Sequence, residues 1–555
     1  MLFAQIHALA TPLRMKHRAL LSTTVCGALF SACWSAQGSK EEVDERVYPI
    51  LEAASEQVTG VNKAIPIVRP VDTLRQRLLD SPTAVRLSLV EALDVAAENS
   101  RDFQRQKEQL YLAALDLTRA MRQFDVVYSG DASSGINGEG RETASDVDVG
   151  AGLGASTQTE SGGRIVADFA TTFLRSVLSG GDFDGSSILS LSITQPLMRG
   201  YGRRIAREPL TQAERNVIYQ MRAFERFRAT FATQVVSDYY GVIQQAQNLK
   251  NVEANYESVR QSRLRTEEEF NASRKTISDL GRERQSELSA SNNRVRAQNQ
   301  LETSLDRFKI TLGLPVTTKA DLDVTEIDRL VERGVTQFSV QEPAAVSIAL
   351  DRRYDHRTVL DQVADAARKI AVAEDALRMG LAFTSAVSVP STTGPGLEPD
   401  WSKVDWSAGF DLDLALNRFD ERNSYRSSLI TLEVNIRARE QSQDNIASQI
   451  RAALRNIQTA FDSYAIQVEA EKVARLRVES TTELYAAGRT NALDVLDAKD
   501  SLLASQLSLT QAIVDYAIAR IQLLRDLEGL CLEPQGLRFD PALEVPVMAT
   551  AGERP

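Results

Sequence analysis

Two carboxylates three residues apart stand beside a turn signal in a long proline-free part of this 555-residue chain. Asp494 and Asp497 lie in the stretch YAAGRTNALDVLDA, which begins at Tyr485. A ring of carboxylates in a narrow aqueous opening repels anions, attracts cations and can bind a divalent ion. Their chemistry therefore depends on whether the fold places them at such an opening.

The stretch has an echo upstream, FNASRKTISDLGR, which begins at Phe270. Three residue pairs share the same spacing along the chain: Phe270 with Tyr485, Thr276 with Asn491, and Asp279 with Asp494. We call this shared spacing the tip interval. Self-similarity at a fixed interval indicates an internal repeat.

Both stretches have the pattern of a turn between two helices. Asn491 is a favoured N-cap, and Asp494 falls at the third helical position, where its carboxylate can reach back to the N–H of the cap. Thr276 and Asp279 fit the same pattern. Gly488 is suited to the left-handed residue that ends a preceding helix. The sequence therefore predicts the tips of two helical hairpins.

Composition excludes some classes of protein. The net charge of −11 argues against a nucleic-acid binder, and 43% hydrophobic with 25% charged residues excludes a disordered chain. Outside the N-terminus no run of about 18 apolar residues indicates a membrane-spanning helix. The alternating strands of a membrane β-barrel give a weaker sequence signal, so composition does not exclude a protein of that class.

The sequence has few residues in the patterns expected of an enzyme active site. Its three histidines are His7, His17 and His356, and no Cys or His cluster has metal-ligand spacing. The glycines of GLGAST and ESGGR do not follow a strand and open a helix, as a phosphate loop requires. We expect no catalytic site, cofactor or metal, and we expect His356 to be a surface or capping residue. Energy for any transport must come from a partner.

The N-terminus reads as a targeting segment. Residues 15–33 have a basic start, an apolar stretch and small residues at the end, so the true start is expected at Met15. The final FSAC resembles a lipobox in which Cys33 is acylated; the alternative is an ordinary signal peptide cleaved nearby. The residue after Cys33 is Trp34 and not the Asp that would favour retention in the inner membrane. Cys531 is left alone and is expected to pack as a small apolar residue.

Proline positions outline the architecture. None occurs between Pro209 and Pro315 or between Pro399 and Pro534, and helix interiors exclude proline. Each window is predicted to hold a long helix, a break at the tip motif and a second helix. The first helix, from about Arg204 to Phe270, spans about 100 Å at about 1.5 Å per residue. A helix at 91–124 is echoed at 348–381, with Ala-Leu-Asp at 92–94 aligned with Ala-Leu-Asp at 349–351.

Six alternating segments are predicted to be strands, four within about 125–198 and two within about 381–418. A short turn at 159–163 contrasts with longer polar connections near 135–145, 176–187 and 391–403. Short turns on one side and long loops on the other are expected of outer-membrane barrels. A small periplasmic β-sandwich is the alternative.

Three motifs together resemble the TolC-like outer membrane efflux protein family, of the lipoprotein type. YAAGRTNALDVLDAKDSLLASQLSLTQAIVDYAIARIQLL is similar to its C-terminal coiled-coil motif. ITQPLMRGYGRR at 193–204 and LDRFKITLGLP at 305–315 are similar to a strand-to-helix junction and to the exit from the first coil. The resemblance covers roughly residues 87–530.

The resemblance implies a fold of mixed all-α and membrane-β class. Internally duplicated long helical hairpins form a trimeric α-barrel, joined to a shared outer-membrane β-barrel. Open strand edges are forbidden in lipid, so six strands of one chain must be completed by other copies. The implied segments are a signal peptide at 1–33, an N-terminal extension at 34–86, a first repeat at 87–315, an equatorial linker at 316–342, a second repeat at 343–530 and a C-terminal equatorial tail at 531–555.

The chain departs from the family pattern in two places. The family commonly has four strands per chain, whereas six segments are found here. The second strand-to-helix junction, LALNRFDER at 414–422, lacks the proline that the first junction has at Pro196.

The resemblance also assigns roles to the tips. Asp494 and Asp497 would line a constricted periplasmic entrance, and a latch of Tyr485, Asp279, Arg489 and Thr490 would hold it shut, with Tyr485 bridging to Asp279. Gly488, Leu493 and Leu496 would meet a periplasmic adaptor; the alternative is that both leucines pack between the coils.

The function implied is that of an exit duct in the bacterial outer membrane, for a tripartite efflux or type I secretion system. Its partners would be two further copies, an adaptor, an inner-membrane pump or ABC exporter, and outer-membrane lipid, but no nucleic acid. The alternative is a periplasm-spanning structural coiled-coil lipoprotein without channel activity. The sequence does not indicate what is exported.

Overall fold

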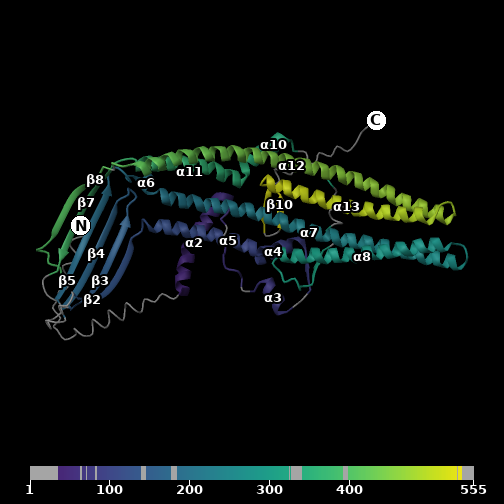
Figure 1. The fold of residues 1–555 in the computed structure, drawn as a ribbon, viewed down its shortest axis with the longest axis horizontal. Helices are drawn as coiled ribbons and strands as arrows, with labels where there is room; N and C mark the ends of the chain where they lie inside the picture. Colours follow the sequence, from purple (N-terminus) through teal and green to yellow (C-terminus); the bar gives the residue numbers. More distant parts are fainter. Residues whose placement is uncertain are drawn as a thin grey trace.

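The chain is elongated, with a β-sheet at one end and two helical hairpins at the other (Figure 1). The computed structural model describes residues 36–539 except 63–64, 71, 82–83, 139–144, 177–183, 324, 327–334, 336–339, 392–397, 415 and 534–535. The signal segment and Cys33 lie outside the described residues. No described helix is both long and apolar enough to cross a membrane.

Two long hairpins form the helical body. In the first, α7 (Glu208–Asn271) is followed by α8 (Ile277–Thr311). In the second, α12 (Phe419–Ala486) is followed by α13 (Ala492–Asp526). Both ends of α13 are offset from those of α8 by the tip interval. The predicted duplication and the predicted long helices are confirmed, since α7 has 64 residues and is about 96 Å long.

The helices that precede the hairpins differ from expectation. Each was expected to be continuous, but α4 (Leu89–Asn99) and α5 (Arg101–Arg122) are separated at Ser100, and α10 (Glu342–Arg352) and α11 (Tyr354–Ala376) are separated at Arg353. Both separating residues have extended backbone, with φ −64° and ψ 131° at Ser100 and φ −61° and ψ 124° at Arg353. The Ser100 side chain caps α5 by accepting from Phe103 N–H.

The structural alignment of these repeated helices also differs by one helical turn from the alignment that the Ala-Leu-Asp echo predicts. One shared interval relates Ser100 to Arg353 and relates two pairs of fully buried alanines, Ala92 with Ala345 and Ala96 with Ala349. This interval is shorter than that of the Ala-Leu-Asp echo, which aligned Ala92 with Ala349. The alanines contact the long helices, so packing sets the register of the repeat. The sequence echo is misplaced by one helical turn, because that shift returns similar residues to the same helix face.

The six predicted strands form a single antiparallel sheet, which is against the sandwich alternative. Its order is β2-β3-β4-β5-β7-β8. The bounds are β2 Val127–Gly138, β3 Ser145–Gln158, β4 Arg164–Ser176, β5 Asp184–Pro196, β7 Gly380–Pro390 and β8 Asp405–Asp413. β5 pairs with β7, so the two halves of the chain share one sheet.

Smaller elements surround the middle of the helices. α2 (Ala36–Thr59) packs against α5 and α7, and α3 (Leu74–Asp80) packs against α4. β1 (Val85–Leu87) pairs in parallel with β6 (Ala320–Leu322), and β9 (Leu530–Glu533) pairs with β10 (Gly536–Phe539). α6 (Arg203–Ala206) joins β5 to α7. At the second junction α12 begins without a proline, after Arg418.

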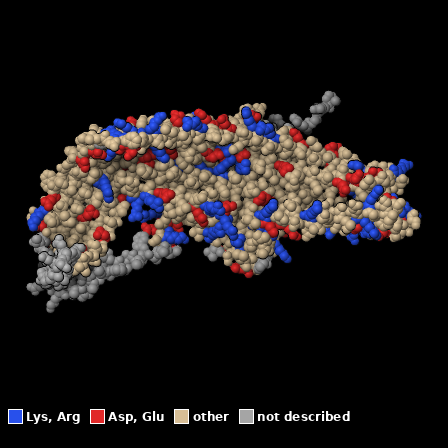
Figure 2. Space-filling model, viewed as in Figure 1, with Lys and Arg blue, Asp and Glu red and all other residues tan. Residues whose placement is uncertain are grey.

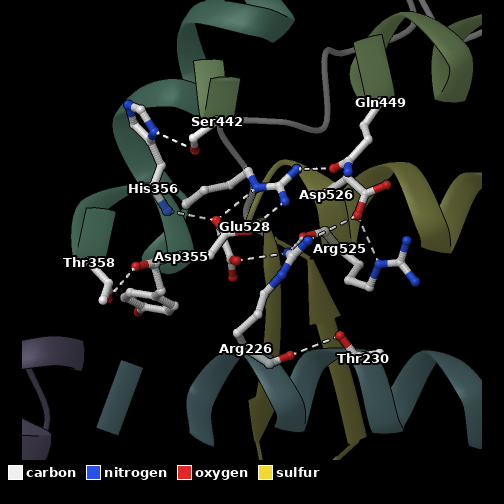
Figure 3. A network of polar contacts seen from close by, with 12 residues as sticks. Arg226, Thr230, Asp355, His356, Thr358, Ser442, Gln449, Arg525, Asp526 and Glu528 are labelled. Atoms are coloured by element: carbon white, nitrogen blue, oxygen red, sulfur yellow. Dashed lines mark hydrogen bonds and ion pairs between the residues drawn. The ribbon is translucent and has the colours of Figure 1, made fainter. Parts of the chain in front are cut away.

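A buried ionic network joins α7 to the ends of α11 and α13 (Figure 3). Arg226 of α7 donates to Asp526 at 3.2 Å, to Glu528 at 2.8 Å and to the Arg525 carbonyl at 2.7 Å. Burial raises the pKa of Glu528, and Arg226 opposes that rise. At the start of α11, Arg353 donates to Asp355 at 2.6 Å.

His356 is a buried residue of this region, 3% exposed, so the expectation of a surface position is wrong. Its Nδ1 lies 3.1 Å from the Ser442 hydroxyl of α12, which explains the burial: the start of α11 packs against that helix. Burial lowers the pKa of His356, so the ring is neutral at pH 7.

We expect Arg226→Met to destabilise the folded chain by about 3–5 kcal/mol at pH 7, because it leaves the buried Glu528 carboxylate without the guanidinium that it contacts and removes one of the two arginines that pair with Asp526. The deficit should shrink as the pH falls, since protonation of Glu528 removes the uncompensated charge and its raised pKa favours the folded state at low pH. Chemical denaturation followed by circular dichroism measures both. The control, Arg451→Met, breaks an exposed pair with Glu342 and should cost less than about 0.5 kcal/mol. Equal effects of the two variants would contradict this.

Two helix-ending glycines allow a second comparison. Gly313 and Gly488 have similar φ values, 73° and 70°, so an alanine at either should cost about 1 kcal/mol. A Cβ at Gly313 would lie 2.3 Å from the Asn99 carbonyl oxygen, whereas Gly488 has no atom within 4 Å. Gly313→Ala should therefore cost roughly 1–3 kcal/mol more than Gly488→Ala in denaturant titrations. Equal losses would show that the Asn99 contact relaxes freely.

Candidate functional site at the helical tips

The two tips have the same backbone. Each first helix ends in a residue with positive φ, Ser273 at 59° and Gly488 at 70°. The hydrogen bonds that close them match residue for residue at the tip interval, as in Arg274 N–H to Glu269 at 2.8 Å and Arg489 N–H to Leu484 at 2.9 Å. The left-handed end predicted at Gly488 is confirmed, and its counterpart Ser273 carries the strain of a non-glycine residue there.

The second helix of each hairpin begins with a side-chain cap. Thr276 and Asp279 form the predicted reciprocal capping box, with both backbone bonds at 3.2 Å. In the second tip the Asn491 side chain accepts from Asp494 N–H at 3.0 Å, as predicted. The Asp494 carboxylate does not reach back to the cap; it accepts instead from the Thr490 hydroxyl, which lies closer.

Three carboxylates follow one another along α13. Asp494 is half-buried, and Asp497 and Asp500 are exposed. Partial burial raises the pKa of Asp500, and the charge of Asp497 raises it further. Sequence reasoning missed Asp500, although its spacing of three residues from Asp497 continues the pattern. Side chains of this spacing lie on neighbouring positions of one helix surface, so they can act together on a cation.

The aromatic residue of the second tip meets a cation of the first. The Lys275 ammonium lies 4.1 Å from the centre of the Tyr485 ring, and the phenol group of Tyr485 raises the pKa of Lys275. Bonds from Thr276 lower the pKa of Asp279, and the nearby Lys275 lowers it further. Lys275 therefore stands between Tyr485 and Asp279. Sequence reasoning missed it, although the tip interval places it opposite Thr490.

The remaining latch residues are arranged differently from the prediction. The Tyr485 hydroxyl is buried and has no hydrogen-bond partner within the described part of the chain, so its bridge to Asp279 stays a prediction. Thr490 contacts Asp494, and Arg489 is exposed. The tip thus leaves the Arg489 guanidinium accessible to groups outside a single chain.

Leu493 and Leu496 have different surroundings. Leu493 is 47% exposed at the tip, beside the exposed Gly488, whereas Leu496 is 7% exposed and packs inside the hairpins. The contact with an adaptor stays a prediction, and Leu493 is the better placed of the two leucines to make it.

The tips carry charges of both signs (Figure 2). No group of three or more His, Cys, Asp or Glu among the described residues is arranged to hold a metal ion. What the arrangement can do is attract, repel and delay charged solutes.

Known proteins have similar sequences and a similar fold. The sequence model described as "Outer membrane efflux protein" matches residues 345–527. Outer membrane protein TolC of Escherichia coli (strain K12) is 22% identical over 357 residues, which cover 61% of this chain and 69% of that protein. Within residues 345–527 the chain is therefore similar to the outer membrane efflux proteins.

Solved structures of outer membrane channels have the same fold at low sequence identity. The channel OprN is 16% identical with a TM-score of 0.60, over 84% of this chain and 93% of that chain. Campylobacter jejuni CmeC is 15% identical with a TM-score of 0.59, over 79% and 85%. The fold of these channels therefore extends over most of the chain, well beyond residues 345–527.

We expect Asn491→Ala to loosen the start of α13 by about 1 kcal/mol, because the cap bond to Asp494 N–H is lost. The amides at the start of the helix should then exchange with deuterium roughly fivefold faster. Thr276→Ala should do the same to α8, and Thr482→Ala, at an exposed position within α12, serves as the control. Unchanged exchange in Asn491→Ala would show that Thr490 and Asp494 hold the turn without the cap.

Proposed function

We propose that the chain is the outer membrane exit channel of a tripartite efflux or type I secretion system. Three copies would form a tube through which solutes pass passively across the periplasm and the outer membrane. The observation that carries this proposal is the six-stranded sheet, which has an apolar face, a polar face and two open edges.

The register of the sheet separates its side chains by polarity. One row of directly opposed residues crosses β3, β4, β5 and β7 with large apolar side chains: Leu153, Phe169, Leu189 and Val389. A row on the other face crosses all six strands with small or acidic residues: Ser129, Gly154, Asp168, Ser190, Ser388 and Asp405. Such a sheet is suited to separate lipid from water.

The described part of the chain leaves much of the apolar face uncovered. Leu153 is 64% exposed, Phe410 is 70% exposed and Trp406 is 76% exposed. β2 and β8 are the two edges of the sheet, and neither has a second neighbouring strand among the described residues. In lipid such edges must be paired. Three copies joined edge to edge would give one closed sheet of eighteen strands, and the similarity to outer membrane efflux proteins supports the number three.

The long hairpins would extend the same assembly through the periplasm. They point away from the sheet, and their tips are its most distant part (Figure 1). With three copies around one axis, Asp494 and Asp497 would recur around the far opening. They would act as the entrance that favours cations, and a latch of Tyr485, Asp279, Arg489 and Thr490, joined by Lys275, would hold it closed.

The proposal includes partners. A passive tube needs an inner-membrane pump or ABC exporter to supply energy and a periplasmic adaptor to connect the two. Gly488 and Leu493 are the exposed tip residues we assign to the adaptor contact, with Leu496 supporting them from inside. Acylation of Cys33 would add a lipid anchor in the outer membrane.

The test is planar-bilayer current through the purified protein, compared with Asp494→Asn/Asp497→Asn. We expect small, cation-selective steps in the native protein and larger or less selective steps in the variant, because six charges leave the opening of a trimer. The control, Asp102→Asn/Asp116→Asn, removes as many exposed carboxylates from α5, where side-chain exposure is 68% and 70%, and should leave selectivity unchanged.

Two outcomes would change the proposal. Steps that the tip substitutions leave unchanged would keep the channel but reduce the two carboxylates to helix-capping groups. No current from protein shown to be trimeric would contradict the channel and favour the structural coiled-coil lipoprotein.

A further inference from the structure

A buried acid and a half-buried base lie between the two hairpins, behind the tips. Glu283 of α8 is 1% exposed, and Lys499 of α13 is half-buried. Glu283 is seven residues beyond the cap Thr276, and Lys499 is eight beyond the cap Asn491, so both lie about 10–12 Å behind the start of their helices.

The two side chains converge on one face of α7. Glu283 Oε1 accepts from the Ser262 hydroxyl at 3.4 Å. Lys499 Nζ donates to the Ser258 carbonyl at 3.2 Å. Ser258 and Ser262 are one helical turn apart, so α7 receives one group from its own hairpin and, beside it, one group from the other.

The carboxylate of Glu283 is incompletely satisfied. Its Oε2 is buried and has no hydrogen-bond partner in the described part of the chain. Burial raises the pKa of Glu283, and among the surrounding charges Lys499 opposes that rise most strongly; Asp279 adds to the rise and Lys275 opposes it. Burial lowers the pKa of Lys499, which Glu283 opposes and Arg265 reinforces. Each group therefore shifts the pKa of the other toward the value that favours its charged form.

The contact between the two hairpins is uneven. Each hairpin packs extensively within itself, whereas α13 contacts α8 only slightly and meets the first hairpin mainly through α7. The contact of Lys275 with Tyr485 lies at the tip itself. Lys499 thus provides a hydrogen bond that crosses between the hairpins behind the tip.

We propose that Glu283 and Lys499 form a buried electrostatic clamp that holds the second hairpin against the first and sets the closed width of the entrance. The inference rests on the proposed function only in treating the tips as a channel entrance. The clamp itself is a property of one chain. Both residues are positioning residues, because neither reaches the tip opening.

The clamp is tested by the distance between the two tips of one chain. Spin labels at Ala272→Cys and Ala487→Cys, two exposed positions related by the tip interval, are placed in a Cys531→Ser background, and labelled chains are diluted with unlabelled chains. Pulsed electron paramagnetic resonance then reports the distance within one chain. Lys499→Met and Glu283→Gln should each shift the distribution to longer distances and broaden it.

A charge exchange distinguishes electrostatics from packing. Glu283→Lys/Lys499→Glu should restore at least part of the short distance that Lys499→Glu alone loses, because the pair is opposite in charge again. Lys472→Met, which removes an exposed lysine of α12, should leave the distance unchanged. Unchanged distances in both single variants would overturn the clamp. So would an inter-tip distance in the charge-exchange variant that is no shorter than the distance in Lys499→Glu alone.

Bilayer currents from the same variants separate the two proposals. Wider tips should give larger conductance if the tube conducts. Native protein without current would contradict the proposed function, while the spin-label distances would still decide whether the clamp exists.

Discussion

The structure depends on the two open edges of its sheet. One chain supplies six strands, and the outer backbone groups of β2 and β8 have no partner in the described part of it. The apolar face leaves Trp406 and Phe410 largely exposed, so neither the hydrogen bonds nor the burial of this sheet is complete in a monomer. Joining copies edge to edge would complete the hydrogen bonds, and surrounding lipid would cover the apolar face. The long hairpins follow the same constraint, because they leave one end of the sheet in parallel and continue any ring that the strands begin.

The two halves of the chain share a backbone plan but differ in chemistry at equivalent places. Phe103 of α5 packs against Phe224 and Phe231 of α7, with ring centres 5.8 and 5.5 Å apart. Its equivalent in α11, at the interval that relates Ser100 to Arg353, is His356, which stands in an ionic surrounding instead. Gly313 and Glu528 likewise occupy the same left-handed position. The duplicated halves therefore share the path of the backbone, whereas the start of α5 packs in apolar surroundings and the start of α11 in charged ones.

Much of this architecture was predictable from local patterns. Proline spacing indicated the long helices, alternation indicated six strands, and the caps at Thr276 and Asn491 indicated the tips. Prediction failed where a distant contact decides the outcome. Nothing near Ser100 or Arg353 requires a helix to break there, and the burial of His356 depends on α12. In the site, Lys275 was missed because its contact with Tyr485 crosses between hairpins, and Leu493 and Leu496 differ only in what packs against them.

The closure of the sheet by further copies is the central claim, and edge-to-edge cross-linking measures it most directly. In a Cys531→Ser background, a cysteine at Ala132 of β2 is combined in turn with one at Ala408 or Phe410 of β8, and the protein is oxidised in membranes. If three copies share one closed sheet, at least one combination gives a covalent trimer and no larger ladder, while each single cysteine gives no trimer. Cross-linked species that stop at dimers or extend without limit, or no cross-links in any register, would contradict the account.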